Sequence, residues 1–222
     1  MYIAIEGVIG VGKTTLARLL QPVFGAGTLL EVFEENPFLS DFYADRARYA
    51  FQTQIFFLLS RYRQQRRTVA TMLEIHKHLI ADYTFEKDAL FAQINLKGDE
   101  LDVYYKVHEA LAEKIILPDL VLYLRADTDV LMRRIALRDR PYERNMERDY
   151  IAQLNEAYDE FFSERQPRRT PVLWIDTDEL DYVRVPENLA WVENRIRQVL
   201  KLPPFQAELP LPLTGQSGET TE

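Results

Sequence analysis

The chain has 222 residues, a formal net charge of −8 at pH 7 and no cysteine, and 47% of its residues are hydrophobic. Its length and apolar content suit a globular protein with a sizeable core, and no apolar run is long enough to span a membrane. The acidic balance argues against nucleic acids and anionic membranes as partners, and the lack of cysteine excludes disulfides, thiol catalysis and cysteine-based zinc sites.

The first predicted strand, residues 2–6, runs into a glycine-rich loop that is followed by a helix with apolar periodicity. The loop has the spacing Gly-x-x-x-x-Gly-Lys-Thr of a phosphate-binding loop in its required strand-to-helix context. Its backbone N–H groups and the helix N-terminus would cradle phosphate oxygens, with Lys13 reaching the β- and γ-phosphates and Thr14 ligating Mg²⁺. The predicted nucleotide-binding residues here are Gly7, Gly10, Val11, Gly12, Lys13, Thr14 and Thr15.

Strand-like runs rich in Val, Ile and Leu alternate with segments of helical spacing along the chain. Such alternation predicts an α/β fold, with a five-stranded parallel sheet covered by helices on both faces. The predicted strands are 2–6, 28–33, 78–82, 120–125 and 172–176. The main predicted helices are 43–73, 99–117, 128–138, 147–164 and 186–200. We expect one domain over 1–202 and a disordered tail from 203 to 222, which is rich in Pro, Gly, Ser and Thr.

Ligands of parallel sheets gather beyond the carboxyl ends of the strands, so the residues that end these runs are candidates. Glu31 follows strand two and could take a proton from a substrate hydroxyl that attacks a γ-phosphate. The alternative is a solvated acidic loop, with Asn36-Pro37 as a turn before the next helix. Spacing alone leaves both interpretations open.

Asp82 ends strand three, and an acid at this position beside a phosphate loop commonly holds the metal. Asp88, one and a half helical turns on, could face the substrate. Asp82 could also cap the N-terminus of the next helix, and the two roles are compatible.

A third cluster is rich in arginine. Arg134 and Arg138 stand at i and i+4 on one face of a predicted helix, and Arg140 lies just past its end. Guanidinium groups that point the same way suit a triphosphate, whereas the alternative is a solvated helix face. The opposite face of this helix is predicted to carry Leu131, Ile135 and Leu137.

Two further groups are interpreted as structural. The run of arginines from Arg61 to Arg67 predicts an exposed face of the 43–73 helix. His76, His78 and His108 show no metal-ligand spacing.

These clusters, in this order, resemble the deoxyribonucleoside kinase family, and most closely its bacterial deoxyadenosine/deoxyguanosine kinase branch. The similarity runs from about Tyr2 to Leu200, and the arginine-rich segment together with the helix around Gln54 is its most restrictive part. Besides the phosphate loop, the matching segments are 31–43, 51–61, 82–84 and 134–140.

The resemblance implies roles at the acceptor end of the site. Glu31 matches the carboxylate that deprotonates the 5′-hydroxyl of a deoxynucleoside, and Gln54 matches the side chain that pairs with the base edge. Tyr43 and Glu143 match the pair that binds the 3′-hydroxyl. Residues near the base are matched by Arg61 and Asp88.

The resemblance also implies a P-loop kinase fold with ATP as phosphate donor, Mg²⁺ on Thr14 and Asp82, and a lid over about 134–146. Arg134, Arg138 and Arg140 of this lid would close over the donor phosphates, and Arg134, Arg138 and Lys13 would stabilise the transferring charge. The segment 176–182, with Asp176 and Asp178, resembles the loop that wraps the donor adenine.

A homodimer is implied in the same way, with the helices 43–73 and 99–117 as its expected interface. The chain opens directly into a strand without a signal peptide, so we expect a cytoplasmic enzyme.

One position departs from the family pattern. Many members carry an arginine directly after the acid of strand three, where this chain has Tyr83. Either Lys87 or an arginine of the lid would then supply the positive charge for the transferring phosphoryl group.

The sequence predicts ATP-dependent phosphorylation of a deoxynucleoside, most simply a purine one. The amide of Gln54 can pair with adenine, but a flipped amide can meet cytosine or guanine, so the base, the tolerance of ribose and the choice of donor stay open. One alternative is a nucleoside monophosphate kinase, although the acidic acceptor end with Glu31, Glu34 and Glu35 would repel a phosphate. Another is a non-catalytic nucleotide-binding subunit, which only Tyr83 suggests.

Overall fold

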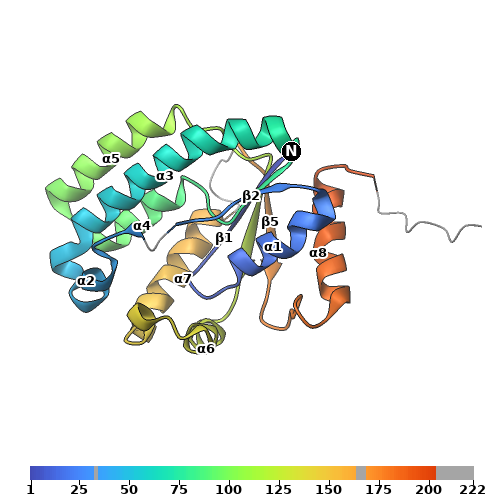
Figure 1. The fold of residues 1–222 in the computed structure, drawn as a ribbon. Coiled ribbons are helices and arrows are strands. Elements are labelled where there is room, and N and C mark those ends of the chain that lie inside the picture. Colours follow the sequence, from blue (N-terminus) through green and yellow to red (C-terminus); the bar gives the residue numbers. More distant parts are fainter. Residues whose placement is uncertain (33–34, 164–168, 204–222) are drawn as a thin grey trace, which may run out of the picture.

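Five parallel strands form a single sheet at the centre of the molecule, in the order β2-β3-β1-β4-β5 (Figure 1). The computed structural model describes residues 1–32, 35–163 and 169–203. The strands are β1 (Tyr2–Gly7), β2 (Gly27–Leu29), β3 (Leu79–Ala81), β4 (Leu120–Arg125) and β5 (Val172–Asp176). The predicted α/β class and the all-parallel sheet are confirmed. The order reverses direction at β1, and in such sheets the ligand crevice lies where the order reverses.

Helices cover both faces of this sheet, as predicted. Figure 1 shows α1 and α8 on one side and α3, α4, α5 and α7 on the other. The helices are α1 (Lys13–Phe24), α2 (Leu39–Ala44), α3 (Arg46–His76), α4 (Lys87–Asn95), α5 (Gly98–Ala112), α6 (Thr128–Arg138), α7 (Arg148–Phe162) and α8 (Pro186–Val199), with a 3-10 turn η2 (Pro141–Glu143) after α6. In the described residues, no helix has the length and apolarity to cross a membrane.

The central strands form as near-continuous apolar runs because both of their faces are covered. All six residues of β1 are buried, and so are the first five of β4. The two strands pair in parallel from Ile3–Leu120 to Gly7–Leu124. This rigid pair therefore fixes the start of the phosphate loop, which leaves β1 at Gly7.

Strand two is shorter than the predicted 28–33, because side chains bind its backbone beyond Leu29. The carbonyl of Leu30 accepts a hydrogen bond from Gln64 Nε2 at 2.9 Å. The N–H of Glu31 donates to Asp82 Oδ1 at 2.8 Å. β2 thus ends at Leu29, four residues before the predicted end of the strand, and Phe33 lies outside the described residues.

The predicted helix 43–73 is two helices. Asp45 separates them, and its side chain accepts a hydrogen bond from the N–H of Arg48 at the start of α3. The helix α4 begins at Lys87 with Glu86 at its N-cap position and no side-chain cap, so the interpretation of Asp82 as a helix cap is wrong. The predicted tail lies outside the described residues except for its first residue, at 203.

Two predictions of side-chain exposure are also wrong. Leu137 is 86% exposed, whereas Leu131 and Ile135 are buried. Positions 131 and 135 are one helical turn apart, but position 137 is 200° further around the helix. Arg61 is only 6% exposed, although Arg63, Arg66 and Arg67 of the same run are exposed as expected.

Candidate active site

The loop between β1 and α1 has the backbone of a phosphate cradle. Gly7, Gly10 and Gly12 all have positive φ angles, of 145°, 90° and 105°. A side chain at Gly7 would collide with the carbonyl oxygen of Leu124 on β4, so this position needs glycine for space as well as for conformation. The loop can therefore lie close to the sheet in a tight turn, and turns of this kind bind anions through their backbone N–H groups.

Lys13 follows this loop as the first residue of α1. Its ammonium donates to the carbonyl oxygens of Gly7 at 2.7 Å and Val8 at 3.2 Å. Burial, and to a smaller extent the ammonium of Lys87, lower the pKa of Lys13 to about 8. Two ammonium groups close enough to repel one another favour an anion in the space that they share.

Asp82 joins the ends of three elements. Its carboxylate accepts from the Thr14 hydroxyl at 2.5 Å and from the N–H of Glu31 at 2.8 Å. The two oxygens of Thr14 and Asp82 are hard ligands of the kind that Mg²⁺ takes, few in number beside water and phosphate. They therefore fit a magnesium ion. Within the described residues, no group of three or more Asp, Glu or His side chains could hold a metal ion.

Glu31 lies between two cations. Arg61 Nε donates to its Oε1 at 2.9 Å, and Lys87 Nζ donates to its Oε2 at 2.6 Å. Burial alone would raise the pKa of Glu31, but Arg61 and Lys87 outweigh it and hold that pKa well below its usual range. The solvated-loop interpretation is thus wrong for Glu31, whose half-buried carboxylate is paired with two cations, although Asn36-Pro37 does form the predicted turn.

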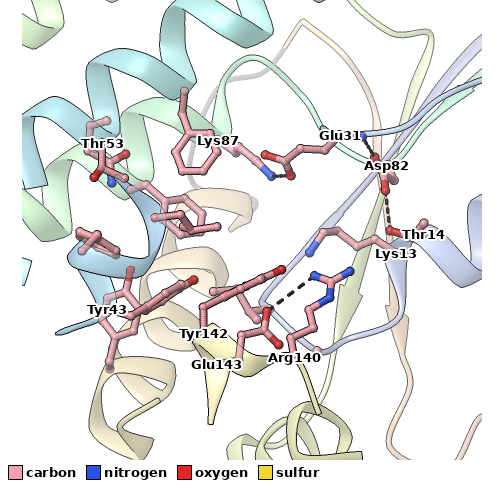
Figure 2. A pocket seen from close by; sticks show the side chains of 18 of the residues that line it. Lys13, Thr14, Glu31, Tyr43, Thr53, Asp82, Lys87, Arg140, Tyr142 and Glu143 are labelled. Atoms are coloured by element: carbon pink, nitrogen blue, oxygen red, sulfur yellow. Dashed lines mark hydrogen bonds and ion pairs between the residues drawn. The ribbon is translucent and has the colours of Figure 1, made fainter. Parts of the chain in front are cut away.

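A cavity of about 120 Å³, which we call the acceptor cavity, lies beside these groups (Figure 2). In Figure 2, Lys13 and the Glu31–Lys87 pair point into it from one side, and Tyr43, Tyr142 and Glu143 lie across from them. Of the predicted substrate-binding residues, those that line it are Glu31, Tyr43, Gln54, Arg61, Asp82 and Glu143.

Asp88 does not line the acceptor cavity. It is fully buried and forms an ion pair with Arg61, on the side of the guanidinium away from Glu31. Asp88 therefore positions Arg61 and does not face the cavity, contrary to the sequence-based expectation.

The predicted lid carries a carboxylate as well as arginines. Arg138 forms a bidentate pair with Glu143, with Nε–Oε2 and Nη2–Oε1 distances of 3.1 and 2.8 Å. Arg140 Nη1 lies 3.6 Å from Glu143 Oε1. The ring of Tyr142 stacks on that of Tyr43, with centroids 6.2 Å apart. These contacts join the lid to the wall of the acceptor cavity.

A second, larger cavity of about 780 Å³, the donor cavity, lies on the other side of the phosphate loop. It is lined by the loop residues from Gly10 to Thr15, the three lid arginines and the segment 178–184. Arg134 Nη1 donates to Thr177 Oγ1 at 2.9 Å, which ties α6 to the end of β5. Asp178 lines this cavity, but Asp176 does not. The carboxylate of Asp176 instead accepts a hydrogen bond from the N–H of Asp178.

A family model for deoxynucleoside kinases matches residues 3–201. The chain belongs to the deoxynucleoside kinase family. It is similar to the deoxyguanosine kinase of Bacillus subtilis (strain 168), with 34% identity over 202 residues that cover 90% of this chain and 97% of that protein. It is also similar to the deoxyadenosine kinase of Dictyostelium discoideum, with 34% identity over 183 residues that cover 80% of this chain and 73% of that protein.

Solved structures of the family have the same fold. The structure of deoxyadenosine kinase from M. mycoides with the products dCMP and a flexible dCDP has a TM-score of 0.77 and 26% identity, and the match covers 90% of this chain and all of that one. The same kinase with bound dCTP has a TM-score of 0.76 and 27% identity, covering 89% of this chain and all of that one. These relatives confirm the resemblance read from the sequence.

This deoxynucleoside kinase is therefore an enzyme of nucleoside phosphorylation that uses a nucleotide as phosphate donor. The two alternatives, a nucleoside monophosphate kinase and a non-catalytic subunit, are not favoured.

Sequence reasoning missed several residues of the kinase site. Phe57, Phe91 and Tyr158 line the acceptor cavity, and Thr53 presents a fully buried hydroxyl that has no hydrogen-bond partner within the described part of the chain. Helical spacing marked these side chains only as apolar or neutral, because periodicity does not tell a cavity wall from a core. Thr53 could have been found from its place beside Gln54.

Proposed function

We propose that this kinase transfers the γ-phosphoryl group of ATP to the 5′-hydroxyl of a purine deoxynucleoside. The observation that carries the proposal is the meeting of the Glu31 carboxylate, Lys13 and the Thr14–Asp82 pair at one side of the acceptor cavity. A nucleoside in that cavity has its primary alcohol beside an ionised carboxylate and a phosphate cradle. The curated relatives support purine bases, since several of them are named deoxyguanosine or deoxyadenosine kinases.

Glu31 orients the 5′-hydroxyl and accepts its proton as the oxygen attacks the γ-phosphorus. The bond from that phosphorus to the β,γ-bridging oxygen breaks, and its electron pair leaves with ADP. Because the transition state of phosphoryl transfer is loose, orientation of the hydroxyl counts for more than the strength of the base. Lys13 stabilises the phosphate charge, and Thr14 with Asp82 would hold Mg²⁺, which neutralises phosphate charge when bound.

The lid over about 134–146 connects the two substrates. Arg138 and Arg140 would exchange Glu143 for donor phosphate oxygens, which bind guanidinium groups with the same bidentate geometry. Glu143 would then bind the 3′-hydroxyl of the nucleoside together with Tyr43. Arg134, held at Thr177, would stay on the donor side with Asp178 beside the donor nucleotide.

Gln54 and Thr53 would meet the base edge. Both side chains are at least 98% buried and line the acceptor cavity, so a base that left their polar atoms unpaired would bind poorly. Arg61 would lie between this edge and Glu31.

A homodimer and a cytoplasmic location complete the proposal. Leu59 of α3 and Val103 of α5 are large apolar side chains with exposures of 36% and 47%, on the two helices expected at the interface. Analytical ultracentrifugation of the purified chain tests the dimer, and a species of twice the chain mass is expected.

A substrate panel tests the function. Purified enzyme with ATP and Mg²⁺ is given the four deoxynucleosides, adenosine, dAMP and dTMP, and the products are separated by chromatography. We expect the 5′-monophosphate of deoxyadenosine, deoxyguanosine or both as the fastest product. Phosphorylation of dAMP or dTMP with no turnover of nucleosides would contradict the proposal.

A further inference from the structure

A buried lysine at the acceptor cavity has no role in the mechanism above. Lys87 is the first residue of α4, is 4% exposed and lines the acceptor cavity. Its ammonium lies 5.8 and 6.0 Å from the ring centroids of Tyr83 and Phe91. Burial of an ammonium group is costly unless it is paired, and it persists where the charge is used.

The pairing of Lys87 differs from that of the other cations of this cavity. Arg61 contacts two carboxylates, Glu31 and Asp88, whereas Lys87 bonds to Glu31 alone among the residues that the structure describes. These four groups carry two negative and two positive charges. Once Glu31 has accepted a proton, the cluster has a net charge of +1, and this charge lies on the ammonium 2.6 Å from the Glu31 carboxylate.

Tyr83 cannot supply this charge or a contact to the phosphoryl group. Its side chain is fully buried, it does not line the acceptor cavity, and its hydroxyl donates to Gln64 Oε1 at 2.7 Å. The position directly after Asp82 therefore faces the packing between β3 and α3. The ammonium that reaches the reacting groups comes from Lys87, four residues further along the chain at the start of α4.

We propose that Lys87 is a catalytic residue, whose ammonium holds Glu31 in place and then donates to a non-bridging oxygen of the transferring phosphoryl group. This inference rests on the proposed function. The proton of the 5′-hydroxyl passes to Glu31, the oxygen–phosphorus bond forms, and the electron pair of the broken bond leaves with ADP. Lys87 keeps its own proton throughout and, with Lys13, encloses the phosphoryl charge from two sides.

Three substitutions at Lys87 test this role. Lys87→Gln keeps a donor for Glu31 without the charge, Lys87→Met removes both, and Lys87→Arg keeps the charge. We expect kcat to fall ~10²-fold or more in the Gln and Met variants, with KM for ATP and for the deoxynucleoside within about threefold of wild type. The kcat of the Arg variant should be at least about tenfold higher than that of the Gln and Met variants. Lys106→Met, at an exposed position of α5, is the matched control and should be unchanged.

A second measurement separates direct contact from support of Glu31. In the wild type, ATPγS should react more slowly than ATP, because sulfur accepts the ammonium hydrogen bond poorly. This rate ratio should fall severalfold in Lys87→Gln, a variant that keeps a hydrogen-bond donor at this position without the charge.

A Gln variant with wild-type kcat, or an unchanged ATP-to-ATPγS ratio, would overturn the role of Lys87 while leaving the proposed function standing. A wild-type enzyme that is inactive on every deoxynucleoside would overturn both.

Discussion

The two cavities of this kinase differ in size and in the side chains that line them. The acceptor cavity is small, at about 120 Å³, and its charged side chains are buried and paired with one another. The donor cavity is larger, at about 780 Å³, and is lined by the phosphate loop and partly exposed arginines. A neutral nucleoside needs a dry, shaped pocket with few polar contacts, whereas a triphosphate is held by charge and backbone dipoles that still act near water.

The cavities meet at a small set of shared residues. Both are lined by Gly10, Lys13, Thr14, Arg138 and Arg140. Phosphoryl transfer is expected at this boundary, where the buried, paired charges of the acceptor cavity meet the phosphate loop and arginines of the donor cavity. Substitutions in the acceptor cavity should therefore affect folding and chemistry, and those in the donor cavity should affect mainly ATP binding.

The largest effect is expected from Arg61→Met. The substitution leaves Glu31 and Asp88 as buried carboxylates without the guanidinium that pairs with both, and loss of one partner from a buried pair costs about 3–5 kcal/mol. Urea denaturation measures the free energy of unfolding. Arg63→Met, on the exposed face of the same helix, should change it by less than about 0.5 kcal/mol. Equal losses in both variants would contradict the pairing described for Arg61.

Glu31→Gln is expected to have the next largest effect. Without the carboxylate, the 5′-hydroxyl loses its proton acceptor, and kcat should fall ~10²-fold or more while ATP binding stays intact. Steady-state kinetics and ATP titration of the same preparation measure the two quantities. Glu35→Gln, an exposed position of the same loop, is the control. Turnover near that of the wild type in Glu31→Gln would remove Glu31 from the role of base.

Arg138→Met should affect the donor end. The variant loses a guanidinium that is one-third exposed and paired with Glu143, so KM for ATP should rise about tenfold with a smaller change in KM for the nucleoside. Arg144→Met, a neighbouring exposed arginine paired with Asp139, should leave both KM values unchanged. A change in nucleoside KM alone would place Arg138 with the acceptor.

Tyr43→Phe should have the smallest of these effects. Loss of one hydrogen bond to the 3′-hydroxyl should raise KM for the deoxynucleoside about fivefold, equivalent to roughly 1 kcal/mol. A 2′,3′-dideoxynucleoside lacks the 3′-hydroxyl, so it completes a double-mutant cycle with Tyr43→Phe. With this substrate, the KM of the variant should equal that of the wild type. A persistent difference would mean that Tyr43 acts through its stacking on Tyr142.

The sequence predicted the parts of the structure that depend on local pattern. The strand–loop–helix around Lys13 and the bounds of α6 follow from spacing and apolar periodicity, and so does the parallel sheet. The end of β2 did not, because Asp82, more than fifty residues away, binds the backbone of Glu31. A one-dimensional pattern does not contain such a contact.

The candidate site was predicted in the same uneven way. Most of the site residues that were predicted from the sequence line one of the two cavities. They lie in motifs that follow one another in the same order along the chains of the family. The burial of Arg61 and its pair with Asp88 were not foreseen, because a run of arginines on a helix is usually solvated. The contact between Lys87 and Glu31 depends on how α4 packs beside β3, which only the fold determines.

The central claim is that the 5′-oxygen of a deoxynucleoside attacks the γ-phosphorus of a donor in the acceptor cavity. The most direct measurement uses deoxyguanosine and deoxyadenosine labelled with ¹⁸O at the 5′-hydroxyl, with ATP as donor, and ³¹P NMR of the product. The account predicts a nucleoside 5′-monophosphate that retains the label in its ester bond to phosphorus. A monophosphate esterified at the 3′-oxygen, or no nucleoside monophosphate at all, would contradict it.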